Sequence, residues 1–304
     1  MHAHGDSFDS TNATVTASYG RRLLLKLDDG REVQARPKGK TLRAVCGDEV
    51  LVQSIDDEQD WQLTRIKKRR NELARTDSRR RREILAANID LLVVVIAQSP
   101  PADYFIMDRF LGAAHLMDCE CLILDNKVDL ENTNEQVVKQ YQAIGYRTIA
   151  TSATQGTGIE ELRKHCRGKF CALVGQSGVG KSSLSNALIP SANERTKTLS
   201  RSSKEGRHTT VTAKMLDLPG GGALIDSPGV RDFAPHIGTL TEVALAFPEL
   251  SSLADQCKFA NCLHLAEPGC AVKDAAEDSA IHERRYKSYR RLLNISRGLL
   301  EKFS

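Results

Sequence analysis

The chain has 304 residues, of which 40% are hydrophobic and 27% are charged. This composition is typical of a soluble globular protein with room for two or three domains. No apolar run approaches the roughly 20 residues that a membrane-spanning helix needs. The start, MHAHGDSFDSTNATV, lacks the apolar segment of a signal peptide. We therefore expect a cytoplasmic protein that makes no membrane contact and has a disordered tail over residues 1–13.

The net charge of +4 is modest, but the charge is unevenly distributed. Residues 65–82, RIKKRRNELARTDSRRRR, hold ten Lys or Arg residues against two acidic ones. Such a run is typical of a nucleic-acid contact or of a solvated linker, and both readings stay open here. For residues 71–82 we predict a basic linker.

Short strand-like segments follow the tail. They read ATVTASYG, RRLLLKL, REVQAR, DEVLVQSI and WQLTRI, with turns such as DDG and CGD between them. Several short strands with close turns favour a small barrel or sandwich. Because the basic tract adjoins it, we predict an oligonucleotide-binding (OB) barrel that binds RNA over residues 14–70.

Strands that alternate with helices begin near residue 83. IDLLVVVIA is a continuous β-branched run, as in a strand buried on both faces of a parallel sheet. After it, helical YFIMDRFLGAAHLMD, NEQVVKQYQAIG, GIEELRKHC and KSSLSNALI alternate with strand-like CLILD, YRTIAT, FCALVG, TAKMLDLP and GGALIDSPG. This alternation predicts a doubly wound α/β domain over residues 83–236.

The stretch GQSGVGKS lies between an apolar strand and a helix and matches the phosphate-binding P-loop at every fixed position. Its glycines let backbone N–H groups converge on phosphate oxygens, and the helix N-terminus adds a favourable potential. Lys181 is expected to reach the β- and γ-phosphates, and the Ser182 hydroxyl to bind Mg²⁺. The predicted phosphate-binding residues are Gly175, Gln176, Ser177, Gly178, Val179, Gly180, Lys181, Ser182 and Ser183.

The stretch NKVD follows the strand CLILD and indicates which base is bound. The Asp129 carboxylate can only accept hydrogen bonds, so it suits the N1–H and N2–H donors of guanine, a pair that adenine lacks. Asn126 can face O6 and N7 of the base, and the Lys127 stem can lie across the ring. Ser152 and Ala153 follow the next strand, where a backbone N–H can meet O6. Together these residues favour a GTPase over a P-loop kinase or ATPase.

A further loop, DSPG, ends the last strand of the pattern. On its own this is a common turn, but downstream of a P-loop it predicts that Asp226 holds Mg²⁺, through water, and that the Gly229 N–H senses the γ-phosphate. Here the base-reading residues precede the phosphate loop, which reverses the usual GTPase order. Since such loops all lie at the carboxyl ends of parallel strands, joining the old termini and cutting after the Asp226 strand keeps the site intact. Residues 226–232 then lead directly into the C-terminal region.

In this order and these motifs, the sequence resembles the circularly permuted GTPases of the ribosome small-subunit-dependent GTPase A family, over nearly its whole length. The resemblance implies binding to the small ribosomal subunit and its 16S rRNA, and hydrolysis of GTP to GDP that the subunit stimulates during late maturation. We expect a monomer. The alternative is a GTP-gated RNA-binding module in which hydrolysis has little catalytic role.

The polar stretch SRSSKEGRHTTVTAK occupies the place of switch I, where Thr209 or Thr210 is expected to close on Mg²⁺ and the γ-phosphate. Many GTPases carry a water-orienting Gln soon after the glycine of the loop that corresponds to DSPG here, residues 226–229, which we call the metal loop. This chain has Val230 there, and an apolar side chain cannot orient water. The resemblance implies that His208 assists hydrolysis instead. The family usually shows a third Thr where this chain has Val211, so which Thr binds Mg²⁺ stays open.

Residues 237–304 contain a Cys-rich stretch with the spacing C-x4-C-x-H-x5-C. Three thiolates and one imidazole make a closed tetrahedral set, which is typical of structural Zn²⁺, and a cytosolic compartment disfavours disulfides. The spacing also matches the zinc module of the resembled family. Zinc is expected to hold a segment too small to fold alone. The predicted ligands are Cys257, Cys262, His264 and Cys270.

The helical segment that follows carries a row of basic residues. Its basic face either contacts RNA or is simply solvated. The residues are Arg284, Arg285, Lys287, Arg290 and Arg291.

Overall fold

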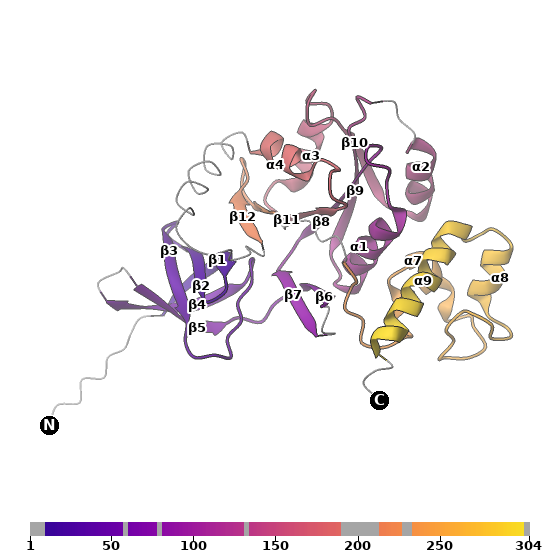
Figure 1. Ribbon diagram of the computed structural model, residues 1–304, viewed down its shortest axis with the longest axis horizontal. Coiled ribbons are helices and arrows are strands. Elements are labelled where there is room, and N and C mark those ends of the chain that lie inside the picture. Colours follow the sequence, from indigo (N-terminus) through magenta and orange to yellow (C-terminus); the bar gives the residue numbers. More distant parts are fainter. Residues whose placement is uncertain are drawn as a thin grey trace.

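A closed five-stranded barrel forms the N-terminal part of the protein (Figure 1). The computed structural model describes residues 10–56, 60–77, 81–130, 134–189, 213–226 and 233–300. The barrel strands are β1 (Thr11–Tyr19), β2 (Arg22–Leu27), β3 (Glu32–Pro37), β4 (Glu49–Asp56) and β5 (Asp60–Ile66). Their order is β1-β2-β3-β5-β4, and pairing of β1 with β4 closes the sheet on itself. Leu23, Leu25 and Leu27 alternate along β2 and point into the core, as the period-2 pattern requires.

The second part is a six-stranded α/β sheet with the order β10-β9-β8-β11-β13-β12. Its strands are β8 (Leu91–Ala97), β9 (Glu120–Asn126), β10 (Arg147–Thr151), β11 (Phe170–Gly175), β12 (Lys214–Asp217) and β13 (Ala223–Asp226). Neighbouring strands pair in parallel except β12, which runs antiparallel to β13. All seven residues of β8 are buried, as a strand covered on both faces should be.

Helices cover both faces of this sheet. They are α1 (Tyr104–Leu116), α2 (Glu135–Ile144), α3 (Ile159–Cys166) and α4 (Lys181–Leu188). Leu92 and Val94 of β8 share a core with α1 and α2, whereas Leu91 and Val93 share a second core with α3 and α4. The predicted doubly wound α/β architecture is confirmed.

The barrel is attached to the edge of the α/β sheet through β12. Ala17 of β1 pairs with Lys214 of β12, so that the two sheets form one 11-stranded arrangement. An ion pair of 2.8 Å between Lys26 and Asp217 reinforces this contact. Its two side chains are exposed, so it adds little stability by itself.

Two parts of the predicted division into domains differ from the structure. Strand β1 begins at Thr11, so the predicted tail gives way to the barrel before residue 13. The predicted basic linker contains strand β6 (Glu72–Thr76), which forms a hairpin with β7 (Arg82–Ala87). The reason is pairing with a distant part of the chain. The backbone N–H of Thr76 donates to the carbonyl oxygen of Ala234, and the backbone N–H of His236 donates to the carbonyl oxygen of Ala74. The hairpin is thereby paired with the chain that leads into the C-terminal part.

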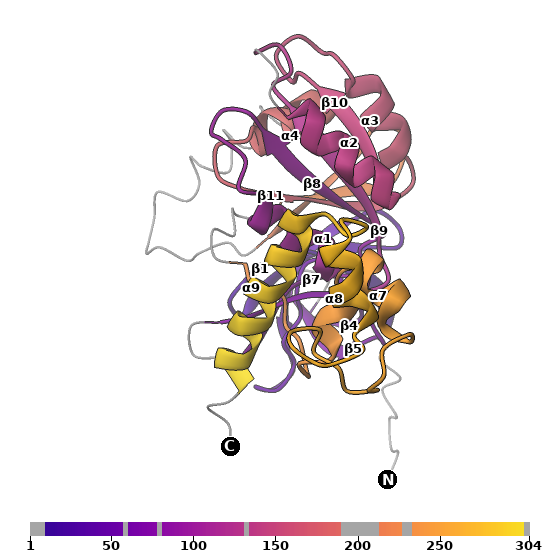
Figure 2. The ribbon, with the colours of Figure 1, turned by 90° about the vertical axis from the view of Figure 1, so that its right-hand side faces the viewer.

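The C-terminal part packs beside α1, as two views of the ribbon agree (Figures 1 and 2). Its helices are α6 (Glu242–Leu245), α7 (Pro248–Ala254), α8 (Ala271–Glu277) and α9 (Glu283–Leu300). Their apolar residues form a separate core that also includes Cys262, Cys270 and, from α1, Phe105. Among the described residues, none of the helices combines the length and apolar character needed to span a bilayer.

Candidate nucleotide site and metal centre

The predicted base-reading and phosphate-binding residues lie at one edge of the α/β sheet. Asn126 ends β9 in register with Thr151 at the end of β10, and Gly175 ends β11 beside Val95 of β8. Because these strands are parallel, their carboxyl ends meet where open α/β sheets bind ligands. The structure therefore brings together segments that are separated and reversed along the chain.

Two P-loop glycines have conformations and surroundings that exclude a side chain. Gly175 has a φ of +137°, and a Cβ there would lie 2.2 Å from the carbonyl oxygen of Val95. Gly180 has a φ of +97°, and a Cβ there would lie 2.4 Å from Nδ2 of Asn126. The tight turn before α4 thus depends on glycine for both backbone geometry and space.

Asn126 connects the base loop with the phosphate loop. Its Nδ2 donates to the carbonyl oxygen of Val179 at 2.9 Å, and its Oδ1 accepts from the Thr151 hydroxyl at 3.1 Å. The side chain is buried, with 2% exposed. In this arrangement Asn126 holds three loops at fixed positions relative to one another.

Lys127 makes a second connection between the two loops. Its ammonium group donates to the carbonyl oxygens of Ser99 at 2.6 Å and Gly178 at 2.8 Å. Lys127 has a φ of +68°, which is uncommon for a residue with a Cβ. These two hydrogen bonds fix the Lys127 side chain between the P-loop and the loop that follows β8. The side chain therefore lies next to the place predicted for the base.

Asp129 is exposed at the rim of the site, where a ligand could reach it. Hydrogen bonding from Ser152 is the main cause that lowers the pKa of Asp129, and Thr154 contributes from 3.5 Å. Ser152 is itself fully buried and accepts from the Gln155 N–H at 3.1 Å. The carboxylate is therefore held ionised, as an acceptor for two N–H donors must be.

Lys181 and Asp226 lie close enough at the phosphate end of the site for their charges to interact. Lys181 donates to the carbonyl oxygens of Gly175 and Gln176, both at 2.8 Å. Burial lowers the pKa of Lys181 and raises the pKa of Asp226, and in each case the charge of the other residue opposes that change. Ser182 and Ser183 are exposed at the start of α4. A cation and a carboxylate beside a helix N-terminus suit a phosphate with its Mg²⁺.

Four predicted site residues lie outside the described part of the chain: His208, Thr209, Thr210 and Gly229. Their roles stay predictions. Conversely, sequence reasoning missed one contact of the P-loop: Oε1 of Gln176 accepts from the backbone N–H of Asp103 at 3.0 Å. Asp103 is also the N-cap of α1, accepting from the N–H groups of Phe105 and Ile106. An Asp before a helix was a readable cap signal, but its contact with the P-loop depends on tertiary packing.

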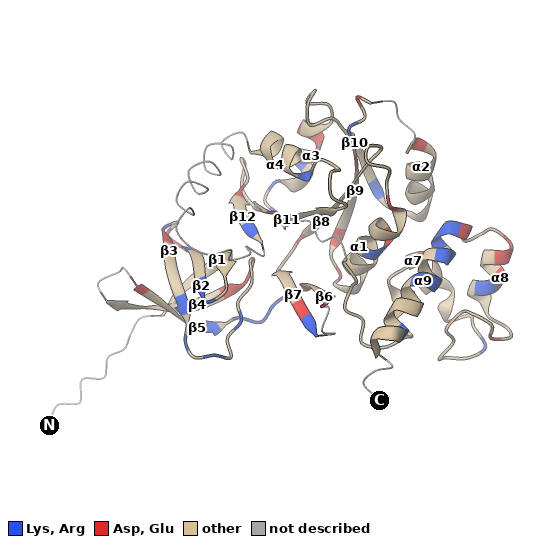
Figure 3. Ribbon diagram, viewed as in Figure 1, with Lys and Arg blue, Asp and Glu red and all other residues tan. Residues whose placement is uncertain are grey.

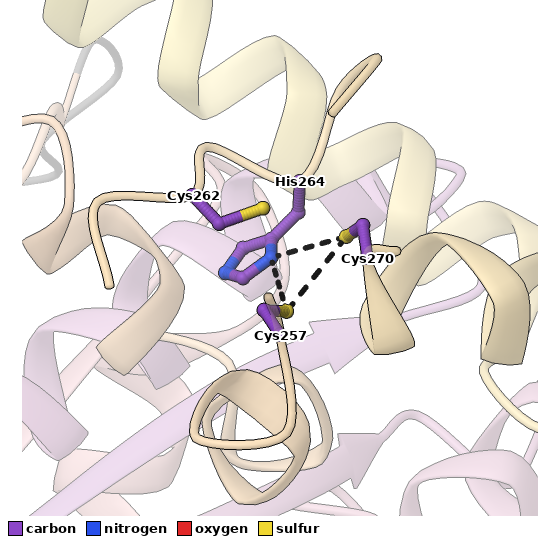
Figure 4. A group of neighbouring side chains, drawn as sticks. All are labelled: Cys257, Cys262, His264 and Cys270. Carbon is purple, nitrogen blue, oxygen red and sulfur yellow. Dashed lines mark hydrogen bonds between the residues drawn. The ribbon is translucent and has the colours of Figure 1, made fainter. Parts of the chain in front are cut away.

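The four predicted zinc ligands converge in the C-terminal part (Figure 4). Nδ1 of His264 lies 3.5 Å from Sγ of Cys257 and 3.4 Å from Sγ of Cys270, and these two sulfurs are 3.9 Å apart. All four donor atoms lie within 4.8 Å of one another. Ligands of a tetrahedral Zn²⁺, with bonds of about 2.3 Å to sulfur and 2.0–2.1 Å to nitrogen, are separated by roughly 3.5–3.8 Å. The donor set therefore fits zinc in type and spacing.

Glu267 was missed as a support of this cluster. Its carboxylate accepts from the backbone N–H groups of Leu263 and Leu265 at 2.8 Å and of Ala266 at 3.0 Å. Burial acts to raise the pKa of Glu267, but these hydrogen bonds outweigh it and lower the pKa to about 2. The loop turns back at His264, where φ is +53°. The Glu267 carboxylate stabilises this turn through the backbone N–H groups on both sides of it.

The basic face predicted on the last helix needs a correction. Arg285 is fully buried and pairs with Asp108 of α1 and Glu249 of α7. It is neither solvated nor available to RNA. Lys287, Arg290 and Arg291 are exposed.

A P-loop, a base loop and Asp226 at the end of β13 lie at one sheet edge, with the base loop first in the chain, and this arrangement defines a circularly permuted P-loop GTPase. The chain belongs to the RsgA GTPase family, whose model matches residues 66–235. It is 37% identical to the small ribosomal subunit biogenesis GTPase RsgA of Flavobacterium psychrophilum, over 92% of this chain and 91% of the relative. It is also 37% identical to the protein of that name from Azotobacter vinelandii, over 95% and 87% of the two chains.

Two solved structures resemble the whole fold. YjeQ from Thermotoga maritima matches with a TM-score of 0.75 and 28% identity, over 94% of this chain and 98% of that one. YloQ, described as a circularly permuted GTPase, matches with a TM-score of 0.71 and 26% identity, over 97% and 96%. The predicted class of enzyme, a GTP hydrolase, and the predicted permuted fold are confirmed.

Proposed function

We propose that this GTPase acts in maturation of the small ribosomal subunit, binding 16S rRNA and linking GTP hydrolysis to its binding and release. The main support for the nucleotide site is the hydrogen bond from Nδ2 of Asn126, in the base loop, to the carbonyl oxygen of Val179, in the P-loop, at 2.9 Å. The ribosomal role is transferred from the names of relatives that are 37% identical over most of the chain. The division of labour follows the predicted domains, with RNA binding in residues 14–70, the GTPase in 83–236 and a zinc module in 237–304.

In the proposed site, Asp129 accepts the N1–H and N2–H of guanine, and Lys181 neutralises charge on the phosphates. Ser182, Asp226 and either Thr209 or Thr210 would hold Mg²⁺, which when bound withdraws charge from the phosphate oxygens. His208 is proposed to assist hydrolysis. Since Asp129 and Lys181 follow the ends of β9 and β11 and Asp226 ends β13, the rigid sheet sets the relative positions of these three residues.

The RNA-binding surface is proposed to include a basic hollow on the barrel. This hollow of about 420 Å³ lies between the β1–β2 turn and the chain after β3, and is lined by Arg21, Lys40 and Arg43 among others. All three basic residues are exposed. Further Lys and Arg residues lie along the chain after β5, on β7 and on α9 (Figure 3). A phosphate backbone suits such a surface, because each neutralised phosphate releases counterions.

The C-terminal module is proposed to hold one structural Zn²⁺ through Cys257, Cys262, His264 and Cys270. A closed set of four protein ligands leaves no position for substrate, so the metal would stabilise the fold and take no part in hydrolysis. We also propose that the protein is a monomer and that it acts in the cytoplasm, where small subunits mature.

The deciding experiment measures GTP turnover by the full-length protein with and without purified small ribosomal subunits. Stimulation by small but not by large subunits is expected, with Lys181→Ala as the inactive control. Co-sedimentation under GDP and under a non-hydrolysable GTP analogue then tests whether the nucleotide controls subunit binding. Equal binding under both nucleotides, with turnover that small subunits do not raise, would contradict the proposed role.

A further inference from the structure

A fully buried ion pair joins the C-terminal part to the α/β domain. Nη1 of Arg285, in the first turn of α9, lies 2.5 Å from Oδ1 of Asp108 on α1. Nε and Nη2 of the same arginine donate to the two oxygens of Glu249 on α7, at 2.6 and 3.0 Å. The side chains of Arg285 and Asp108 are both 0% exposed. The guanidinium therefore crosses the boundary between the two parts and is satisfied from both sides.

Aromatic rings and a second arginine surround this pair. The Arg285 guanidinium lies 4.6 Å from the ring centroid of Phe247 and 5.4 Å from that of Tyr141. Arg284 donates to the Tyr141 hydroxyl at 2.7 Å and lies 5.0 Å from the ring centroid of Tyr104. Cation–π contacts of this kind are stronger where water is excluded. Two neighbouring arginines of α9 thus hold the C-terminal part against α1 and α2.

The helix that receives Arg285 also touches the nucleotide site. At its N-terminus, the backbone N–H of Asp103 donates to the P-loop side chain of Gln176 at 3.0 Å. In its middle, Phe110 stacks on Phe233 with ring centroids 4.3 Å apart and planes at 13°. Phe233 is fully buried and lies seven residues after Asp226 in the chain. A single helix, α1, therefore contacts the P-loop, the chain beyond the metal loop and the C-terminal part.

We propose that Arg285 is a positioning residue that seats the C-terminal domain on α1, so that seating of this domain and occupation of the nucleotide site are thermodynamically coupled through α1. A buried ion pair suits such a role because it has two discrete states. With the domain seated, Arg285 pairs with Oδ1 of Asp108 and Nη1 of Arg284 lies 3.6 Å from its Oδ2. With the domain withdrawn, both arginines of α9 leave and Asp108 loses its two counter-charges. Intermediate positions are unfavourable, so the domain is either seated or released.

Coupling of this kind is reciprocal. If GTP and GDP differ in how they position α1, they favour the seated domain to different extents, and loss of the seat must change the two affinities by different factors. The inference rests on the nucleotide site proposed above.

The test uses the full-length, zinc-loaded protein and measures Kd for GDP and for a non-hydrolysable GTP analogue. In Arg285→Met we expect the ratio of the two Kd values to change at least about five-fold, the lower end of typical allosteric coupling. The matched control is Arg290→Met on the same helix, because Arg290 is exposed and its guanidinium lies over Tyr286 of α9 itself, 5.9 Å from the ring centroid. In the control we expect an unchanged ratio.

A second variant shows whether an effect of Arg285→Met comes from misfolding. Asp108→Asn, Glu249→Gln and Arg285→Met together remove all three charges, so no carboxylate is left buried alone. Zinc content and the melting temperature report whether each variant is folded. We expect the combined variant to change the Kd ratio as Arg285→Met does.

Hydrogen exchange of the wild-type protein gives a readout that needs no substitution. We expect the amides of residues 284–289 to differ in protection between GDP and the GTP analogue. Identical protection, or a Kd ratio that folded variants change by less than about five-fold, would overturn the inference while the nucleotide site stands. Failure of the wild-type protein to bind either guanine nucleotide would instead overturn the proposed site, and the inference with it.

Discussion

Asn126 donates a hydrogen bond to the carbonyl oxygen of Val179 at 2.9 Å, across 53 residues of chain. The base loop and the phosphate loop are therefore one rigid unit, although the chain visits them in reversed order. The adjacent Gly180 leaves room for this bond, since a Cβ there would lie 2.4 Å from Nδ2 of Asn126.

Gly180→Ala should accordingly cost nucleotide affinity as well as stability. The left-handed backbone alone should cost about 1–2 kcal/mol, and the clash should also displace Asn126 from the P-loop. We expect GTP affinity, measured by fluorescence titration, to fall at least about ten-fold, which corresponds to about 1.4 kcal/mol.

Gly145→Ala is the matched control for this variant. Gly145 has a φ of +106° at the C-terminus of α2, and no heavy atom lies within 4 Å of a Cβ placed there. It should lower the melting temperature by the part that comes from the left-handed backbone alone and leave GTP affinity unchanged. Equal GTP affinity in the two variants would show that the Asn126 contact is not needed for binding.

Asp129→Asn tests the assignment of the base reader. The amide loses one of two acceptor oxygens and presents N–H donors to the N1–H and N2–H of guanine. Because hydrogen bonds to a charged acceptor are the stronger kind and two of them are affected, GTP affinity should fall about 100-fold or more. Xanthosine triphosphate (XTP) carries an oxygen at the purine C2 and should bind the variant better than GTP does.

The control for this exchange is Glu161→Gln on α3, which is exposed and lies outside the base loop. Competition titrations with GTP, XTP and ATP compare the two variants. If the Asp129→Asn protein still preferred GTP, another group would have to read the base.

The elements of the α/β sheet could be predicted because their signals are local. The continuous apolar run of β8 and the glycine spacing of the P-loop leave few alternatives for the backbone. The convergence of the base loop and the P-loop could also be predicted, since ligand loops gather at one edge of a parallel sheet. The spacing of Cys257, Cys262, His264 and Cys270 similarly predicted a set of metal ligands, and the fold brings their donor atoms within 4.8 Å of one another.

Arg285 could not be predicted in the same way. It lies in the run ERRYKSYRR, where every basic residue is expected to be exposed, either solvated or in contact with RNA, and its partner Asp108 is 177 residues away. Whether a charge in an amphipathic helix is buried depends on which surface the helix meets. Hairpin β6–β7 was missed for a related reason, because its pairing with residues 234–236 is supplied by a distant part of the chain.

Removal of zinc should unfold the C-terminal part. His264→Ala deletes one of the four ligands. The loop between Cys257 and Cys270 then has no imidazole to bind the metal. We expect loss of stoichiometric zinc by elemental analysis and loss of helical signal by circular dichroism. The α/β domain should still bind GTP, with the ratio of its GTP and GDP Kd values changed as in Arg285→Met. A fully folded C-terminal part after exhaustive chelation would show that the cluster holds no structural metal.

Glu267→Gln should weaken the zinc loop without removing a ligand. The amide keeps one acceptor oxygen, so at least one backbone N–H of the loop loses its partner, at a cost of about 1 kcal/mol. The pKa of Glu267 is lowered to about 2 from an ordinary 4.5, so this stabilisation is complete above pH 4.5 and is lost only as the pH falls toward 2. The difference in melting temperature should therefore be constant from about pH 6 to pH 8. A difference that changed over that range would assign the effect to another group.

Lys40→Ala with Arg43→Ala should weaken small-subunit binding and leave GTP affinity alone. Both side chains line the basic hollow of the barrel, away from the sheet edge that binds nucleotide. If each contacts one phosphate, the slope of log affinity against log salt should become shallower by about 2. Lys139→Ala with Lys164→Ala, which removes two exposed charges on α2 and α3, controls for net charge. An unchanged salt slope in the double variant would move the RNA-binding surface away from this hollow, to the basic chain after β5 or to residues 78–82.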